Sequence, residues 1–406
     1  MSYQSQSNAW VAFKAQSAFG AAASAAGATL LRTTGGPGGR LTKATSPSNE
    51  VRPDGMRTRG RHGGKRTSGS YACEWSLGLA DPVLEAVMRG TWSAADLTLD
   101  QGDFTSLTTE ADGIVLASGS PIGLGLRAGE VVRLVDHATP ANNGRNLRIA
   151  ALSASKITTA ETLVANATPD TACAIVRPGR VLINPPEPLK RWFTIEEHER
   201  DIDGSEVFED CLWGSVQIQM QPNGQLVFAP SWTGTGAFRA LTGGAAPHFT
   251  DPVRPGGAPM AVADATVRVG TTDVVDLTAF EITLDTAPGV TDVIASKLSP
   301  DVFPGQLAVT MSLTALRKDL QYLLDFDAET PYALHVLAVD ETAEPKGFLS
   351  LLVPNFTLGE VQKSALSREG GARTQTIQVP ADLVGVDTRG GAWDHTMVKL
   401  QVSNPV

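Results

Sequence analysis

The chain has 406 residues, of which 42% are hydrophobic and 19% charged, with 40 glycines and 25 prolines. This length exceeds what one core usually serves, and the turn-forming residues favour short strands, so we expect a mainly β protein of two or three domains. A net charge of −10 argues against general binding to nucleic acid or to an anionic membrane surface. The three scattered cysteines indicate neither a disulfide scaffold nor a zinc module, and no apolar run predicts a membrane span.

The first 47 residues are dominated by Ala, Ser, Gly and Gln. They have too little apolar bulk to offset the entropy of ordering, so residues 1–47 are predicted to be a mobile N-terminal arm that only a neighbour could order. Lys14, Gln16 and Ser17 interrupt the small-residue stretch, and no basic segment precedes it. A signal peptide is therefore not expected, and synthesis in the cytoplasm is the simplest interpretation.

Residues 48–104 begin with a strand, a long polar loop and a second strand that ends near Leu77. So long a loop is uncommon inside a compact domain unless it has a function. Its cationic residues are Arg52, Arg57, Arg59, Arg61, Lys65 and Arg66. A helix is predicted from Asp81 to Arg89, because Asp81 can cap it, Pro82 suits the first turn and Gly90 ends it.

Residues 105–186 change character and predict several short strands joined by turns, of which Asn142-Asn143-Gly144 is the strongest. We expect a small closed or nearly closed, barrel-like β domain. Residues 187–240 return to longer amphipathic strands, such as Ser215 to Gln221. Residues 241–260, rich in Gly, Ala and Pro, predict a linker to residues 261–406.

The strand and helix at Tyr71 to Arg89 have a counterpart late in the chain. The alternating residues of the first strand match those of a second strand, which leads into a helix predicted from Thr314 to Leu324: Tyr71, Cys73, Trp75 and Leu77 with Leu307, Val309, Met311 and Leu313. After the helix, Phe208 to Ile218 matches Phe348 to Leu358 at a shorter separation. We therefore predict two copies of one module, residues 48–104 with 187–240 and residues 261–406, with 105–186 inserted in the first.

A run of carboxylates follows the predicted insertion: Glu196, Glu197, Glu199, Asp201, Asp203, Glu206, Glu209 and Asp210. Paired carboxylates can bind a hard cation or act as acid and base. However, the spacing does not fit an EF-hand, and the run lies on one strand and its loop. We interpret Glu196, Glu197, Glu199, Asp201 and Asp203 as a solvated acidic surface or the lining of a lumen.

The basic loop has three interpretations. Gly63-Gly64-Lys65 is similar to a phosphate-binding loop, but Arg66 replaces the required Ser or Thr and Arg59 replaces the first Gly. A short Arg-Gly segment for nucleic acid is the second interpretation, and docking on an acidic protein surface, which we favour, is the third. The histidines have no metal-binding spacing and no catalytic motif occurs, so we expect neither an enzyme nor a cofactor or metal site.

Several segments resemble tail tube proteins of long-tailed bacteriophages: Asn49 to Gly55 with the long loop, Ser70 to Leu77 and Ala80 to Trp92. Gly129 to Arg133 and Ala141 to Leu147 look like a β domain found in some of them. The resemblance implies two β-sandwich modules, each with one flanking helix, in a virion tail. It also implies stacked rings that form a conduit for DNA ejection into the host, with the long loop reaching the next ring.

The resemblance further implies that the chain binds itself and other tail proteins, such as the tape measure and the terminator. Duplex DNA would pass transiently and without specificity, and no membrane contact is expected. Three chains with two modules each would make a ring of six modules, whereas a single-module protein needs six chains. The alternative is a host-surface or carbohydrate-binding tail component, for which Trp192, Trp213 and Trp232 would have to line one groove. A glycoside-acting enzyme would rest on the acidic run alone.

Overall fold

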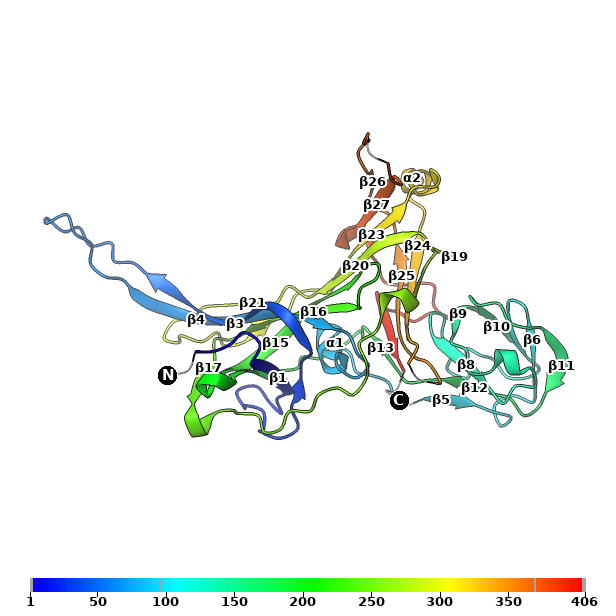
Figure 1. Cartoon of the computed structure of the whole chain (residues 1–406), viewed down its shortest axis with the longest axis horizontal. Helices are drawn as coiled ribbons and strands as arrows, with labels where there is room; N and C mark the ends of the chain where they lie inside the picture. The colour runs from blue at the N-terminus through cyan, green and yellow to red at the C-terminus, as the bar shows by residue number, and fades with distance from the viewer. Residues whose placement is uncertain (1–2, 95, 343, 369, 404–406) are drawn as a thin grey trace.

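The protein is mainly β, as predicted. The computed structural model describes residues 3–94, 96–342, 344–368 and 370–403. Within these ranges the strands form antiparallel sheets, accompanied by the α-helices α1 (Asp81–Val87) and α2 (Gln321–Asp327) (Figure 1). Neither of these short helices could cross a membrane.

The largest sheet has twelve strands, arranged along the path β2-β1-β14-β15-β20-β23-β27-β26. Strands β16 and β17 pair with β15, and β4 connects β16 to β3. The bounds are β1 (Ala9–Ala15), β2 (Thr29–Leu30), β3 (Thr33–Ser46), β4 (Arg61–Glu74), β14 (Phe193–Glu199), β15 (Gly204–Met220), β16 (Val227–Gly234), β17 (Phe238–Thr242), β20 (Leu277–Asp285), β23 (Ala308–Leu316), β26 (Glu360–Lys363) and β27 (Thr374–Val379). Strand β15 is long enough to carry different partners on its two halves.

A six-stranded sheet has the order β13-β28-β25-β24-β18-β19. Its strands are β13 (Arg180–Ile183), β18 (Ala265–Val269), β19 (Thr272–Asp273), β24 (Tyr332–Asp340), β25 (Gly347–Phe356) and β28 (Lys399–Val402), and a separate two-stranded sheet joins β21 (Gly289–Val290) to β22 (Val302–Phe303). One continuous core lies between α1 and the two large sheets, with Trp75, Trp213 and Leu351 among its buried residues.

Residues 97–177 form an eight-stranded sheet with the order β11-β6-β7-β10-β9-β8-β12-β5 and a hydrophobic core of its own. Its strands are β5 (Leu97–Leu99), β6 (Leu107–Glu110), β7 (Gly113–Leu116), β8 (Val131–Val135), β9 (Leu147–Leu152), β10 (Lys156–Thr159), β11 (Asn166–Asp170) and β12 (Ala174–Arg177). The prediction of a closed barrel is wrong, because the short strand β5 pairs with β12 and leaves β11 at the opposite end. The unit docks on the six-stranded sheet, where Gln401 Oε1 accepts a hydrogen bond from Val131 N at 2.7 Å.

The N-terminal segment is part of the largest sheet rather than a mobile arm. Strand β1 pairs with β14 along its whole length, from Ala9 with Glu199 to Ala15 with Phe193. Phe13 is buried and meets the Trp213 ring edge-on, with the centroids 5.6 Å apart. Ordering this segment costs conformational entropy, which was the reason to expect mobility. Backbone hydrogen bonds to β14 and aromatic contacts with residues far along the chain offset that cost.

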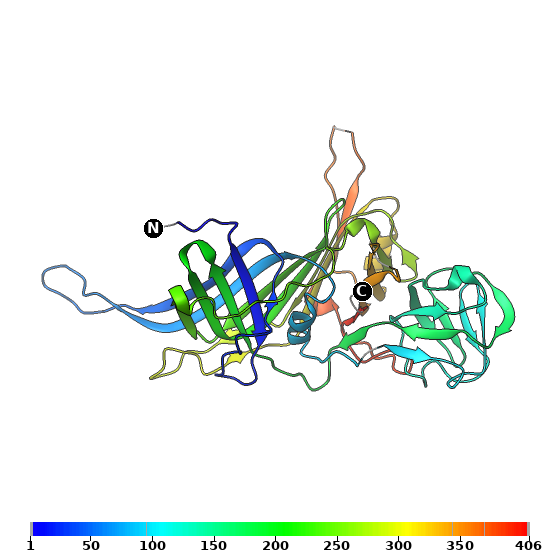
Figure 2. The same ribbon diagram turned by 60° about the horizontal axis from the view of Figure 1, so that its bottom comes forward.

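Strands β3 and β4 form a long hairpin that projects from the body of the molecule (Figures 1 and 2). Strand β3 is rich in glycine, which weakens a strand, but Gly39 pairs with Gly69 under two aromatic rings. A Cβ at Gly39 would lie 2.5 Å from the Phe208 ring, and one at Gly69 would lie 2.7 Å from the Trp232 ring. Glycine is thus required here by close packing.

Candidate assembly surfaces

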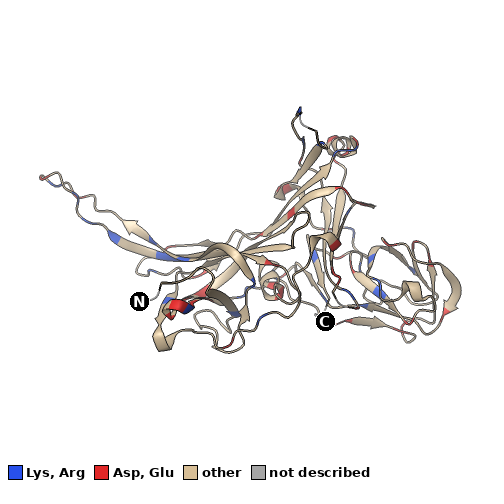
Figure 3. Cartoon of the chain, viewed as in Figure 1, with Lys and Arg blue, Asp and Glu red and all other residues tan. Residues whose placement is uncertain are grey.

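The six predicted cations of the long loop fall into two groups. Arg52, Arg57 and Arg59 lie in the exposed turn between β3 and β4. Arg61, Lys65 and Arg66 lie on β4, so this part of the predicted loop is a strand: Arg61, Lys65 and Arg66 pair with residues of β3. Arg66 also forms an exposed ion pair with Asp292, with 2.9 Å between Nη2 and Oδ2. Figure 3 shows these positive charges spread along the projecting hairpin.

The carboxylate run is not a continuous solvated surface. Glu196 is fully buried and accepts hydrogen bonds from the backbone N–H groups of His248 at 2.6 Å and Phe249 at 2.7 Å. Glu197 accepts one from the Tyr71 hydroxyl at 2.7 Å and another from Gly39 N. Burial raises the pKa of the Glu197 carboxyl, although both hydrogen bonds lower it.

Further along the run, the carboxylates fasten the N-terminal segment. Asp201 accepts hydrogen bonds from Ser5 N at 2.8 Å and Asn8 Nδ2 at 2.5 Å. Asp210 accepts one from Gly20 N at 2.8 Å. Sequence reasoning missed this role because the donors, two backbone N–H groups and the Asn8 side-chain amide, belong to a segment remote in the chain. Of the five predicted surface residues, Asp203 is exposed, Glu197, Glu199 and Asp201 are half-buried, and Glu196 is buried.

The two halves of the chain meet where β20 pairs with β15. The N-terminal half of β15 pairs with β14 and β17, whereas its C-terminal half pairs with β16 and β20. The junction runs antiparallel from Ser215 opposite Asp285 to Met220 opposite Phe280. The junction joins two four-stranded units edge to edge. The first unit has the order β3-β4-β16-β15 and the second has the order β20-β23-β27-β26.

Two strands at the outer ends of these units have a free edge within the described residues. Strand β3 pairs with β4 alone, and β26 pairs with β27 alone. Free edges expose unpaired N–H and C=O groups, which can template pairing with another chain. Pro37 in β3 and the short length of β26 limit this pairing without abolishing it.

Helix α1 lies at the junction of the two halves and is almost wholly buried. Val83, Leu84 and Val87 are fully buried in the main core. The Asp81 carboxylate at its start forms an ion pair with Arg180, and burial raises the pKa of that carboxyl despite the guanidinium, which lowers it. Residues that follow the inserted unit, including Leu182, thus cover this helix.

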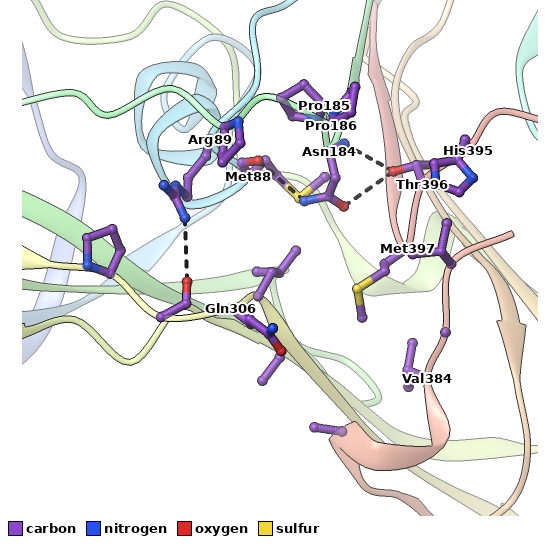
Figure 4. A pocket seen from close by; sticks show the side chains of 18 of the residues that line it. Met88, Arg89, Asn184, Pro185, Pro186, Gln306, Val384, His395, Thr396 and Met397 are labelled. Carbon is purple, nitrogen blue, oxygen red and sulfur yellow. Dashed lines mark hydrogen bonds between the residues drawn. The ribbon is translucent and has the colours of Figure 1, made fainter.

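A cavity of about 960 Å³ lies between the end of α1 and the second half of the chain (Figure 4). Asn184 N donates to Thr396 Oγ1 at 3.0 Å and Asn184 Nδ2 donates to Met88 O at 3.3 Å, which ties the two halves together at its rim. Arg89 Nη1 reaches Gly305 O at 3.5 Å. The lining includes four prolines, and its Thr396 hydroxyl donates to Val398 O at 2.6 Å.

Helix α2 follows β23 as α1 follows β4, but none of its residues is buried. It starts at Gln321 because β23 continues to Leu316, so the predicted start at Thr314 is wrong. The apolar side chains that we call the α2 face are exposed to solvent to the following extents: Leu316 37%, Leu320 55%, Leu323 42%, Leu324 60% and Phe326 38%.

The tryptophans that would have supported a carbohydrate site do not line one groove. Trp213 and Trp232 are buried in the core. Trp192 packs against Phe19 with the ring centroids 5.0 Å apart. Across the described ranges, no cluster of His, Cys, Asp and Glu side chains could hold a metal ion.

These surfaces define a β-rich protein whose exposed features are sheet edges, an apolar helix and a basic hairpin, all of which suit contacts between proteins. The chain matches the family described as phage tail tube protein over residues 6–381. It therefore belongs to the phage tail tube protein family and is a structural component of the virion tail. No curated protein matches the chain.

Proposed function

We propose that this protein polymerises into stacked rings that form the tail tube, a negatively charged conduit for DNA ejection into the host. The observation that carries the proposal is the edge-to-edge junction of β15 with β20, together with the free edges of β3 and β26. A contact that joins two units inside the chain can be repeated between chains, and head-to-tail repetition closes into a ring when the rotation allows it.

Two modules in one chain are supported by the strand pairing. In the first half, the strands pair in the orders β1-β14-β15-β17 and β3-β4-β16-β15. In the second half, the orders β18-β24-β25-β28 and β20-β23-β27-β26 repeat them, with β25 and β26 together in the place of β15. We therefore propose a first module at 48–104 and 187–240 that also includes β1 and β3, an insertion at 105–186, a linker at 241–260 and a second module at 261–406.

The repetition leads to a ring of three chains with six modules. The edge of β15 that pairs with β20 corresponds to the free edge of β26, and β20 corresponds to β3. Antiparallel pairing of β26 with β3 of the next chain would thus continue the sheet around a ring. Other tail proteins, such as the tape measure and the terminator, would contact the rings.

Stacking of the rings is assigned to the hairpin that carries the cations Arg52, Arg57, Arg59, Arg61, Lys65 and Arg66, with its exposed turn reaching the next ring. The projection of the hairpin beyond the body of the molecule supports this role (Figure 1). Passage of duplex DNA requires that the tube does not hold its phosphates, which a chain of net charge −10 favours. Glu199, Asp201 and Asp203 are the proposed acidic residues for the lining of a lumen, and Asp203 is the most exposed of them.

Electron microscopy of the purified chain tests the stoichiometry. We expect tubes whose rings have threefold symmetry, with two unequal modules alternating around each ring. Rings with true sixfold symmetry, made of six chains, would contradict the proposal.

The stacking role has a separate test. The double variant Arg57→Glu, Arg59→Glu should retain rings but lose tubes, because both side chains lie in the exposed turn and have no part in the core. Arg57→Lys, Arg59→Lys is the matched control that keeps the charge. Tubes of unchanged length in the glutamate variant would show that the turn does not join rings.

A further inference from the structure

The α2 face is an apolar feature that the described chain leaves uncovered next to a free sheet edge. Its five side chains come from the end of β23, the segment that follows and α2 itself, and α2 lies beside β26 (Figure 1). Clustered exposed apolar side chains mark a protein interaction surface more often than scattered ones do. The question is which protein covers them.

Helix α1 shows what covers the corresponding surface inside the chain. Both helices have seven residues, and both are followed, two residues after the last helical one, by a residue in the left-handed conformation: Arg89 with φ 55° and Glu329 with φ 51°. Arg89 faces the segment that leads into β23, where it meets Gly305 O. The residue that follows the first helix thus contacts the segment just before β23.

The same contact repeated between chains would place the end of α2 against the start of β4 in a second copy, because β4 corresponds to β23. The charges at the two places are complementary. Asp327 and Glu329 lie at the end of α2, and Arg61 and Lys65 lie at the start of β4. Among the described residues, neither of these two carboxylates forms an ion pair.

The complementary charges identify the hairpin as the partner of the α2 face. We infer that the α2 face is the docking site for the β3–β4 hairpin of a second copy, with Glu329 and Asp327 beside Arg61 and Lys65. This inference rests on the proposed ring and divides the hairpin between two contacts. The strand residues Arg61 and Lys65 lie against α2 of the neighbouring chain in the same ring, beside the proposed pairing of β26 with β3, whereas the exposed turn reaches the next ring.

The first test removes the apolar contact. Leu323→Ser, Leu324→Ser should leave a folded monomer with the thermal unfolding curve of the wild type, since both side chains are already exposed, and should reduce ring formation at least tenfold. Val164→Ser is the matched control, because Val164 is 49% exposed and lies between β10 and β11 of the inserted unit, which is remote from α2 (Figure 1). Light scattering after size-exclusion chromatography measures the assembled fraction.

The second test reverses charges. Glu329→Arg should reduce ring formation, and so should Arg61→Glu, Lys65→Glu; the three changes together in one chain should restore at least half of it. Arginine is compatible with position 329, because Arg89 has the same backbone conformation in α1. If the combined variant forms no more rings than Glu329→Arg alone or than the double variant Arg61→Glu, Lys65→Glu, the hairpin is not the partner of α2.

The outcomes separate the inference from the proposed function. A wild-type chain that never forms rings contradicts the proposed function. Wild-type rings that persist in the Leu323→Ser, Leu324→Ser variant contradict the docking site and leave the tube intact.

Discussion

Helices α1 and α2 follow equivalent strands and have equal lengths, yet one is buried and the other is exposed. Leu84 of α1 has no exposed surface, whereas Leu324 of α2 is 60% exposed. The chain after α1 passes through the inserted unit and returns as β13, which lies over the helix. After α2 it enters β24 within a few residues. An amphipathic helix can bury its apolar side chains against its own chain, as α1 does, or against a partner. The exposed apolar side chains of α2 therefore mark the place where we expect a partner to bind.

The largest expected effect compares the two leucines. Leu84→Ala should lower the free energy of unfolding of the monomer by about 2–5 kcal/mol, because it leaves a cavity in a close-packed core. Leu324→Ala should change it by less than about 0.5 kcal/mol, because the side chain is exposed. Urea denaturation measures both. Equal losses would show that α2 is as much a part of the monomer core as α1.

A second comparison concerns the first residue of each helix. Arg180→Ala should destabilise the monomer by about 1–3 kcal/mol, because it leaves the Asp81 carboxylate buried without its ion pair. The lower part of this range is expected, since the Arg180 side chain is 35% exposed. Gln321→Ala in α2 should be nearly neutral, because the Gln321 side-chain amide donates to Asp325 on the same exposed helix. Thermal unfolding of the two variants tests the contrast.

The edge beside α2 gives a third comparison, in which assembly and stability separate. Ser364 N donates to Thr374 O at 2.9 Å, and N–H groups alternate along a strand, so Lys363 N–H points to the free edge of β26. Lys363→Pro should change monomer stability by less than about 0.5 kcal/mol but prevent ring formation, whereas Lys363→Ala should assemble normally. Rings with the proline variant would exclude this edge as the contact.

The smallest effect is a pH dependence that α1 has and α2 lacks. Because burial raises the pKa of Asp81, the native state binds this proton at a higher pH than the unfolded state does. Asp81 therefore contributes stability that is complete below its unfolded pKa and is lost as the pH rises through the folded pKa. The stability of the wild type relative to Asp81→Asn should increase as the pH falls from 7 toward 4. A difference that is constant over this range would contradict the raised pKa.

Several elements were predictable because their signals are local. The alternation around Tyr71 and around Met311 predicts the two strands, and Asp81, Pro82 and Gly90 predict α1 to within two residues. The prediction for α2 started too early, because backbone pairing with β27 holds Thr314 and Leu316 in β23. The prediction of a closed barrel was also wrong. Closure requires that the two edge strands of the sheet pair with each other, and β5 and β11 do not.

The surfaces were less predictable because they depend on distant partners. Glu196 reads as a solvated charge in a run of carboxylates, but the backbone of His248 and Phe249 makes it a buried acceptor. Arg61 reads as part of a loop, but pairing with Ser46 makes it a strand residue. In each case the partner lies outside the sequence window that carries the local signal.

The sequence alone determined that the protein is mainly β and that a strand followed by a helix occurs twice. Periodicity and turn residues encode these features within a few neighbouring positions. The sequence did not place the strand that precedes the basic turn, which is β3 and not a segment starting near Asn49. Only the tertiary structure decided that the N-terminal segment and the glycine-rich strand β3 join the largest sheet, that α1 is covered and that α2 is not. These outcomes depend on contacts between remote segments, whose burial offsets the ordering entropy that each segment could not offset by itself.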